Sequence, residues 1–218
     1  MPRLASLDVL ATLVLGWPTA QAAEPAPKLP VEEVERIVRD YLLREPEIIY
    51  QAIQELQKRR DLAEAERQKT TIATRKDQIF KSPDDPVLGN PKGDVTLVEF
   101  FDYRCGYCRN MVPALRALLG EDKRLRFVMK EFPILGPDSL VASRAALAAA
   151  RQGKYQEMHF ALLQAADLGE AAVLDLAKKL GLDPVRLAAD MQREDVKRVI
   201  DNNRELAKAL GISGTPSF

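Results

Sequence analysis

Cysteine and histidine are scarce in this chain, which has two cysteines and one histidine among 218 residues. A structural zinc site takes four ligands, and these three residues do not supply a full set. Lysine plus arginine and aspartate plus glutamate each number 32, so the formal net charge is zero. A neutral chain lacks the basic excess that binds nucleic acid or an anionic membrane surface. Beyond the N-terminus, no stretch approaches the roughly 20 apolar residues of a membrane-spanning helix. We therefore expect no nucleic-acid partner and no membrane span.

Residues 1–23 have the layout of a signal peptide. Arg3 provides the basic end, residues 9–17 form a short apolar run, and Ala20-Gln21-Ala22 is a small-x-small cleavage pattern. Asp8, beside the apolar run, weakens the match, and the alternative is a frayed N-terminal helix. The pattern favours export to the periplasm, an oxidising compartment in which a pair of cysteines can form a lasting bond.

Residues 24–80 are predicted to form a linker and a helical oligomerisation segment. A proline-rich stretch leads into apolar residues at helical spacing over 31–42 and again over 48–56, with Pro46 where a second helix can begin. From residue 57 to 78 the pattern is polar, so this helix buries little by itself. Self-association through residues 31–56 would cover the apolar face of each of these two helices. The alternative is that the helices pack on their own domain.

Residues 81–94 are rich in proline, glycine and aspartate and are predicted to mark a domain boundary. The run VTLVEFFDY, which begins at Val95, is apolar enough for a strand buried on both faces. A predicted helix over 107–119 and a strand over 125–131 complete a βαβ unit with parallel strands. Residues 138–210 are helical throughout, in four or five helices, and strand signals return after Gly211. The fold class is therefore α/β.

Both cysteines, Cys105 and Cys108, lie three residues apart at the predicted strand-to-helix junction. At a helix start, unpaired N–H groups and the positive end of the dipole stabilise a thiolate at the first position, while the second sulfur lies one turn inside. Cys105 is thus predicted to attack or be attacked, and Cys108 to resolve the mixed disulfide. Haem attachment needs a histidine where Arg109 stands. An incidental staple and half of a metal site shared between subunits remain as alternatives.

Three stretches in order, VEFFDYRCGYCRNM, FVMKEFPILGPDS and GISGTPSF, resemble the DsbA-type branch of the thioredoxin superfamily. More narrowly, the chain resembles exported ScsC-type members with an N-terminal helical oligomerisation segment. The resemblance covers roughly residues 80 to 218. It implies a thioredoxin fold over 81–218 with an inserted helical domain over 138–210. It also implies thiol–disulfide exchange with exported cysteine-containing proteins, and a membrane partner that reduces or reoxidises the cysteine pair.

The resemblance assigns further site residues. Gly106 and Tyr107 match the pair between the cysteines that tunes redox potential, and Pro216 matches a cis-proline facing the cysteines, with Thr215 before it. The alternative for Thr215 and Pro216 is an ordinary strand-entry turn. Glu99, in an otherwise apolar strand, matches an acidic residue beneath the cysteines. Its burial should raise its pKa and suit it to exchange protons with the second cysteine.

Two alternatives concern single residues. Glu99 could instead reach solvent or Lys130 at the end of its strand. His159, in YQEMHFALL, is predicted to be a helix-face or core histidine rather than a catalytic or metal-binding one. We expect neither a cofactor nor a bound metal.

The chain departs from the family pattern at its end, because Phe218 stands two residues after the predicted cis-proline. The family continues with more strand and a closing helix, so we expect an incomplete sheet with an open edge and poor stability of this chain alone. The predicted activity is that of a disulfide oxidoreductase, leaning to isomerase or reductase because linked catalytic domains can hold one misfolded client. The alternatives are a dithiol oxidase that donates its disulfide and a non-catalytic periplasmic chaperone.

Overall fold

A computed structural model describes residues 29–218, and the predicted signal peptide lies outside the described residues. The chain divides into two compact units, one ending at Gln57 and the other running from Lys58 to Phe218. None of the described helices is both long enough and apolar enough to cross a membrane.

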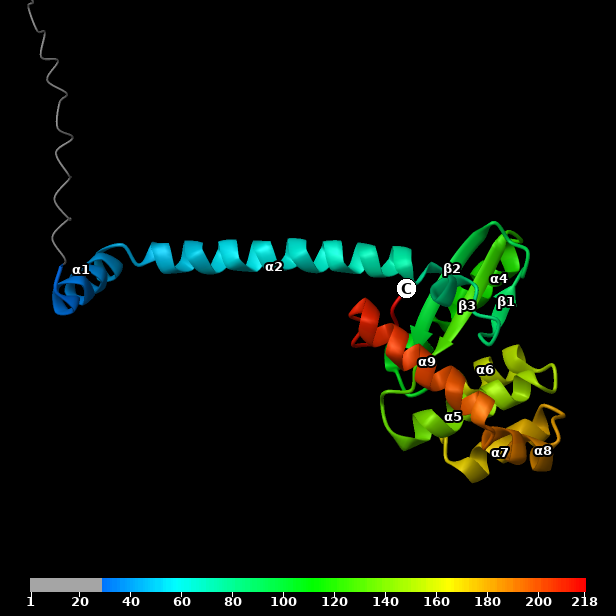
Figure 1. The fold of residues 1–218 in the computed structure, drawn as a ribbon. Helices are drawn as coiled ribbons and strands as arrows, with labels where there is room; N and C mark the ends of the chain where they lie inside the picture. The colour runs from blue at the N-terminus through cyan, green and yellow to red at the C-terminus, as the bar shows by residue number, and fades with distance from the viewer. Residues whose placement is uncertain (1–28) are drawn as a thin grey trace, which may run out of the picture. The chain divides into compact units, whose positions relative to one another are not determined.

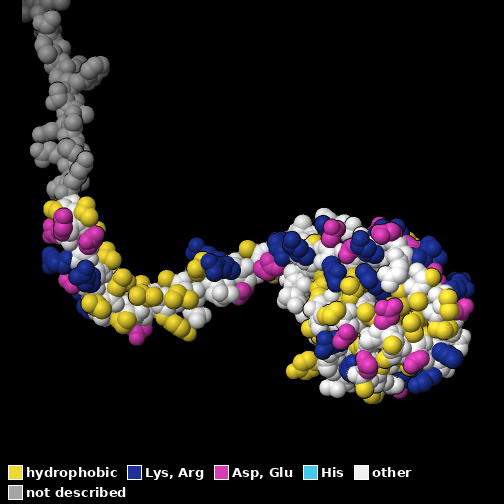
Figure 2. Space-filling view, turned by 90° about the horizontal axis from the view of Figure 1, so that it is seen from below, with side chains coloured by type: hydrophobic (Ala, Val, Ile, Leu, Met, Phe, Trp, Pro, Cys, Tyr) yellow, Lys and Arg dark blue, Asp and Glu magenta, His cyan; other side chains and the backbone are white. Residues whose placement is uncertain are grey.

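The first unit contains α1 (Val31–Arg44) and the start of α2 (Glu47–Thr74), separated at Pro46 as the sequence predicts. Neither helix has a buried residue. Figure 2 shows hydrophobic side chains gathered along this N-terminal part. The large apolar side chains exposed on α1 are Val31, Val34, Ile37, Val38, Tyr41 and Leu43. Among the described residues these side chains form an exposed apolar stripe, and exposed apolar patches of this kind commonly mark surfaces that bind other proteins.

The second unit contains a three-stranded sheet (Figure 1). Its strands are β1 (Val87–Gly89), β2 (Val95–Phe101) and β3 (Leu125–Glu131), in the order β1-β3-β2. The predicted parallel pairing of β2 with β3 is confirmed, with Val95 opposite Leu125 and Phe101 opposite Glu131. β1 pairs antiparallel with β3. This strand lies inside the segment 81–94, where the sequence indicated only a boundary.

Both faces of the sheet are covered, which explains the continuous apolar run of β2. On one face, Leu97 and Phe101 pack with α4 (Gly106–Glu121) and the inserted helices. On the other face, Val98 and Phe100 pack with α3 (Lys76–Phe80) and α9 (Glu194–Leu210). Because side chains alternate along a strand, residue 99 is directed to the same face as Phe101, and residue 130 to the face of α9.

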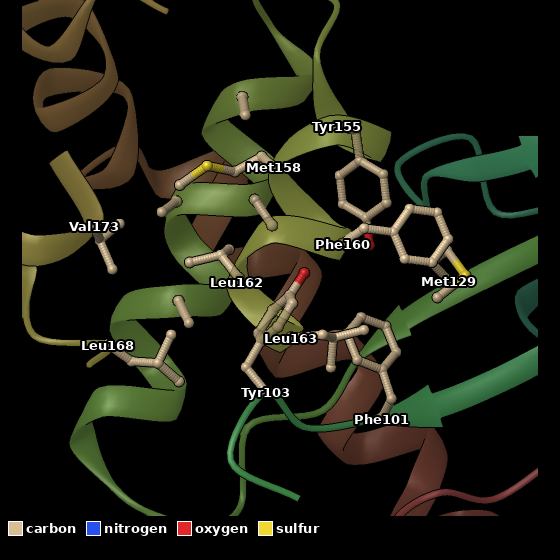
Figure 3. Packing of buried hydrophobic residues seen from close by; sticks show 14 of the residues in the cluster. Phe101, Tyr103, Met129, Tyr155, Met158, Phe160, Leu162, Leu163, Leu168 and Val173 are labelled. Carbon is tan, nitrogen blue, oxygen red and sulfur yellow. The ribbon is translucent and has the colours of Figure 1, made fainter. Parts of the chain in front are cut away.

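The helical insertion consists of α5 (Pro137–Ala150), α6 (Tyr155–Gln164), α7 (Glu170–Lys179), α8 (Pro184–Met191) and α9. The alanines of α5 let its neighbours approach closely: Ala142, Ala145, Ala146, Ala148 and Ala149 are all fully buried. One core joins the insertion to the sheet, and Figure 3 shows it running from Phe101 and Met129 to Met158, Leu162 and Val173.

The final segment returns to the edge of β2. Ser217 and Phe100 exchange both backbone hydrogen bonds in an isolated antiparallel bridge, at 2.8 and 3.0 Å. The Thr215–Pro216 peptide bond is cis, as predicted. The chain therefore brings Thr215 next to the end of β2, where the cysteine motif begins.

Candidate active site

Cys105 is the N-cap of α4, directly after a short turn that follows β2. The turn closes with a hydrogen bond from the Cys105 N–H to the Asp102 carbonyl at 3.1 Å. The Cys105 Sγ accepts the Cys108 N–H at 3.4 Å. This is the place of an N-cap side chain, which satisfies one of the unpaired amides of the first helical turn. The predicted position of Cys105 at the N-terminus of a helix is therefore confirmed.

Thr215 lies against the same sulfur, although 110 residues separate it from Cys105. The Cys105 Sγ–H donates to the Thr215 carbonyl oxygen at 3.1 Å. Both Cys105 and Cys108 are free thiols in this structure, and both are buried. Thr215 and Pro216 are only partly buried, so the backbone beside the sulfur is accessible from one side.

The two cysteines differ in their electrostatic surroundings. Burial acts to raise the pKa of Cys105, but hydrogen bonds with the Thr215 side chain and the N–H groups of Cys108 and Tyr107 outweigh it, so this pKa is lowered. Burial raises the pKa of Cys108 to about 12, and the charges of Cys105 and Glu99 add to the increase. Cys105 is thus the thiol that ionises first.

Glu99 is buried on the face of the sheet that carries the cysteines, with 2% of its surface exposed. Burial raises its pKa from 4.5 to about 7. The alternative in which Glu99 reaches solvent or Lys130 is wrong. Lys130 lies on the other face, where its Nζ pairs with the buried Asp85 and donates to the Gln78 carbonyl. The carboxyl can therefore hold or release a proton near neutral pH.

The residues between the cysteines face outward. Tyr107 is 76% exposed and Gly106 is also exposed. A Cβ atom built on Gly106 would meet nothing within 4 Å, so packing does not require glycine there. These two positions are open to solvent.

Sequence reasoning missed how the turn before Cys105 is held. The buried Asp102 carboxylate accepts four hydrogen bonds, all between 2.7 and 2.9 Å, from Arg104 N–H, Ile134 N–H, Leu135 N–H and the Ser139 hydroxyl. The next residue, Tyr103, is completely buried and its hydroxyl donates to Glu131. The available signal was two polar residues directly after a buried strand.

His159 lies in the core, as predicted. It is fully buried among aromatic rings, and burial lowers its pKa to about 3, so the ring is neutral. Among residues 29–218 there is no group of three or more histidine, cysteine, aspartate or glutamate side chains that could hold a metal ion.

Comparison with known proteins supports the same family from sequence and structure. Residues 96–218, more than half of the chain, match the model described as the DSBA-like thioredoxin domain. The chain belongs to the DSBA-like thioredoxin domain family. Residues 31–61 match a second model, described as the copper resistance protein ScsC N-terminal domain. Both matches agree with the resemblance drawn from the three sequence stretches.

Solved structures of this family are similar over most of the chain. A thioredoxin-like oxidoreductase from Silicibacter pomeroyi DSS-3 is 47% identical, with a TM-score of 0.63, over 65% of this chain and 82% of that one. Proteus mirabilis ScsC in a transitional conformation is 29% identical, with a TM-score of 0.63, over 85% of this chain and 84% of that one.

Among curated relatives, the Na(+)/H(+) antiporter NhaA 3 of Salinispora tropica is 36% identical over 137 residues. That match covers 62% of this chain and 21% of the antiporter. The chain thus spans about a fifth of the length of this curated relative.

Proposed function

We propose that this protein is an exported thiol–disulfide oxidoreductase that exchanges disulfides with cysteine-containing protein substrates through Cys105 and Cys108. The observation that carries the proposal is the contrast between the two sulfurs. Cys105 caps a helix and has a lowered pKa, whereas Cys108 is buried one turn inside with a pKa of about 12. A nucleophile that ionises readily beside a resolving thiol that does not is what stepwise exchange requires.

In the first step the Cys105 thiolate attacks one sulfur of a substrate disulfide. A bond forms between Cys105 and that sulfur, the substrate S–S bond breaks, and the other substrate sulfur leaves as a thiolate. No net oxidation has occurred, because one disulfide has replaced another. If a different substrate thiolate then attacks the substrate sulfur of the mixed disulfide, a new substrate S–S bond forms, the Cys105 thiolate leaves and the substrate has been isomerised. Attack by the freed thiolate itself only restores the original disulfide.

In the alternative second step Cys108 attacks the Cys105 sulfur. This expels the substrate as a thiolate and leaves a Cys105–Cys108 disulfide, so the substrate gains two electrons and the enzyme loses two. With a pKa of about 12, Cys108 must lose its proton as it attacks. We assign that proton to the Glu99 carboxylate, which lies beneath the pair with a pKa of about 7. In the reverse direction Glu99 returns it.

Thr215 and Pro216 are proposed to hold the substrate chain beside Cys105. The Thr215 carbonyl already accepts from the Cys105 Sγ–H at 3.1 Å, so a substrate sulfur bonded to Cys105 would lie next to the same backbone. An extended substrate segment could pair with this backbone as an added strand. Gly106 and Tyr107, both exposed, are proposed to tune the redox potential and to meet the substrate.

Within the same proposal, residues 1–23 direct export to the periplasm, residues 24–80 form the linker and oligomerisation segment, and residues 81–218 form the catalytic domain. Support for assembly comes from the apolar side chains of α1 that are exposed among residues 29–218 and from the match of residues 31–61 to the ScsC N-terminal domain. Linked catalytic domains favour isomerase or reductase activity on misfolded clients. A membrane redox partner would then keep the cysteines reduced.

The proposal is tested by comparing rescue of scrambled ribonuclease with the rate of insulin reduction. If the protein is an isomerase, its reduced form restores activity to scrambled ribonuclease. A Cys105→Ser variant loses both this rescue and the reduction of insulin. Two results would support the alternatives. Rapid oxidation of reduced ribonuclease without isomerisation would indicate a dithiol oxidase. Anti-aggregation activity that survives Cys105→Ser, with no thiol exchange in the wild type, would indicate a non-catalytic chaperone.

A further inference from the structure

A buried cluster of polar side chains lies next to the cysteine motif, on the side of the inserted helices. Glu131, the last residue of β3, is completely buried, and its Oε1 accepts hydrogen bonds from the hydroxyls of Tyr103 and Tyr155, both at 2.8 Å. The Tyr103 hydroxyl also lies 3.1 Å from Nδ1 of His159 on α6. The proposed exchange chemistry uses none of these groups.

Polar groups from the turn before Cys105 and from α5, α6 and α9 lie around Glu131. Tyr103 comes from the turn before Cys105, and Tyr155 comes from α6. Asn203 of α9 contacts the Glu131 main chain. The Ser143 hydroxyl of α5 also interacts with the Glu131 carboxyl, although neither it nor the second carboxyl oxygen, Oε2, makes a hydrogen bond of full geometry in the described part of the chain. Burying a carboxyl costs stability that burying an apolar residue would not, so the position of Glu131 in the core needs a reason.

Tyr103 links this cluster to the redox motif. It occupies the second position of the turn that the Cys105 N–H closes onto the Asp102 carbonyl, and its own carbonyl accepts Nε of Arg109 at 2.8 Å. Figure 3 shows its ring pointing into the core, and the ring meets Phe101 edge to face at 5.2 Å between centroids. The hydroxyl end of Tyr103 is thus fixed by Glu131, and its backbone end shapes the turn that places Cys105.

We infer that Glu131 is a positioning residue for Cys105: by holding the Tyr103 hydroxyl, it fixes the turn that aims the Cys105 sulfur at the N-terminus of α4. The inference rests on the proposed function, in which Cys105 is the nucleophile. A turn that can shift would move the sulfur away from the Cys108 N–H, which it meets at 3.4 Å, and would weaken stabilisation of the thiolate.

The chain offers a matched pair of variants. Tyr103→Phe and Tyr155→Phe each remove one hydroxyl that donates to the same Glu131 oxygen at the same distance. Tyr103→Phe also removes the contact with Nδ1 of His159, so changes at Glu131 itself complete the test. Only Tyr103 belongs to the turn that precedes Cys105. A purely structural role of Glu131 predicts similar effects of the two variants on stability and none on the thiolate. The positioning role predicts that Tyr103→Phe alone changes the acid–base behaviour of Cys105.

The readout is the alkylation rate of Cys105 by iodoacetamide between about pH 4 and 9, in a Cys108→Ser background so that one sulfur reacts. At about pH 6 we expect Tyr103→Phe to react three- to tenfold more slowly, roughly the effect of weakening one hydrogen bond to the thiolate. At high pH, where the thiol is ionised in all variants, the rates should converge. Tyr155→Phe should follow the parent throughout.

Glu131→Gln provides a rescue, because its amide oxygen can still accept from both tyrosines. Burial raises the pKa of Glu131 to about 8, so near pH 6 the carboxyl is uncharged and glutamine matches it in charge. We expect Glu131→Gln to stay close to the parent rate and Glu131→Leu to react at least as slowly as Tyr103→Phe. If Glu131→Leu does not fold, Glu131→Met, which keeps the length of the side chain and removes both acceptor oxygens, takes its place.

Equal alkylation profiles of Tyr103→Phe and Tyr155→Phe, with a parent Cys105 that is more reactive than free cysteine, would overturn the inference and leave the proposed function intact. A parent Cys105 no more reactive than free cysteine would overturn the proposed function itself. The two failures are therefore distinct.

Discussion

Replacing Glu99 by glutamine should make the folded protein more stable at alkaline pH and yet slower in exchange. The carboxyl is buried and its pKa in the folded protein is about 7, against 4.5 for the ordinary group. A carboxyl whose pKa is raised by folding binds more protons in the folded than in the unfolded state between these two values. The free energy of unfolding must therefore fall as pH rises from about 4.5 through 7.

The size of this fall follows from the two values. A difference of about 2.5 between 7 and 4.5, at 1.36 kcal/mol for each pKa unit, gives about 3 kcal/mol as the full cost of ionising Glu99 in the folded protein. Glutamine never ionises. Glu99→Gln should therefore be more stable than the wild type by up to about 3 kcal/mol near pH 8, with little difference near pH 4.

Urea unfolding of the reduced protein at a series of pH values measures the difference. Other buried acids also titrate, so the quantity of interest is the stability of the variant minus that of the wild type at each pH. Glu205→Gln, which changes an exposed glutamate of α9, should give a difference that is small and flat with pH. A Glu99→Gln difference that does not grow between about pH 5 and 8 would refute burial as the cause of the shift.

The same variant separates two roles of Glu99 in exchange. As a proton acceptor for Cys108, its loss should slow resolution of the mixed disulfide by about 10²-fold. As a mere negative charge, which helps to raise the pKa of Cys108, its loss should instead make Cys108 easier to ionise and speed resolution. Quenched-flow trapping of the mixed disulfide near pH 8 distinguishes a slower from a faster step.

Three further predictions concern other parts of the molecule. Thr215→Val removes a side chain that lowers the pKa of Cys105, so alkylation near pH 6 should slow a few-fold and recover at high pH; unchanged rates near pH 6 would contradict this cause. Cys108→Ser should trap substrate on Cys105 as a mixed disulfide, detected by mass spectrometry. If no mixed disulfide accumulates in this variant, Cys108 is not the resolving thiol. Val38→Asp, on the apolar stripe of α1, should lower the mass by light scattering, whereas the neighbouring Arg39→Asp should not; equal masses would count against assembly through this stripe.

Hydrophobic pattern predicted the elements that bury apolar surface regularly. The runs that became β2 and β3 are buried on both faces, and the helix between them begins where the cysteine motif places it. Predicted bounds of 125–131 for the second strand match β3. These elements could be predicted because the spacing of their apolar residues indicates which of their faces are buried.

The missed features depend on distant partners. β1 has three residues, which are too few to show a hydrophobic period. It forms a strand because it pairs with the edge of β3, a partner about 40 residues away in the sequence. The links from Asp102 to Ile134 and from Tyr103 to Glu131 join residues about 30 positions apart. Glu131 is the last residue of the predicted strand over 125–131, and it is completely buried because the inserted helices pack against it. Such contacts follow from tertiary packing, which spacing along the chain does not encode.

The proposed function depends on the charge state of one sulfur, and its titration in the reduced Cys108→Ser variant, followed by thiolate absorbance near 240 nm, measures that state directly. The helix N-terminus and the side chain of Thr215 should give Cys105 an ionisation midpoint below that of free cysteine, and the absorbance should vanish in Cys105→Ser. A midpoint at or above that of free cysteine would contradict the account.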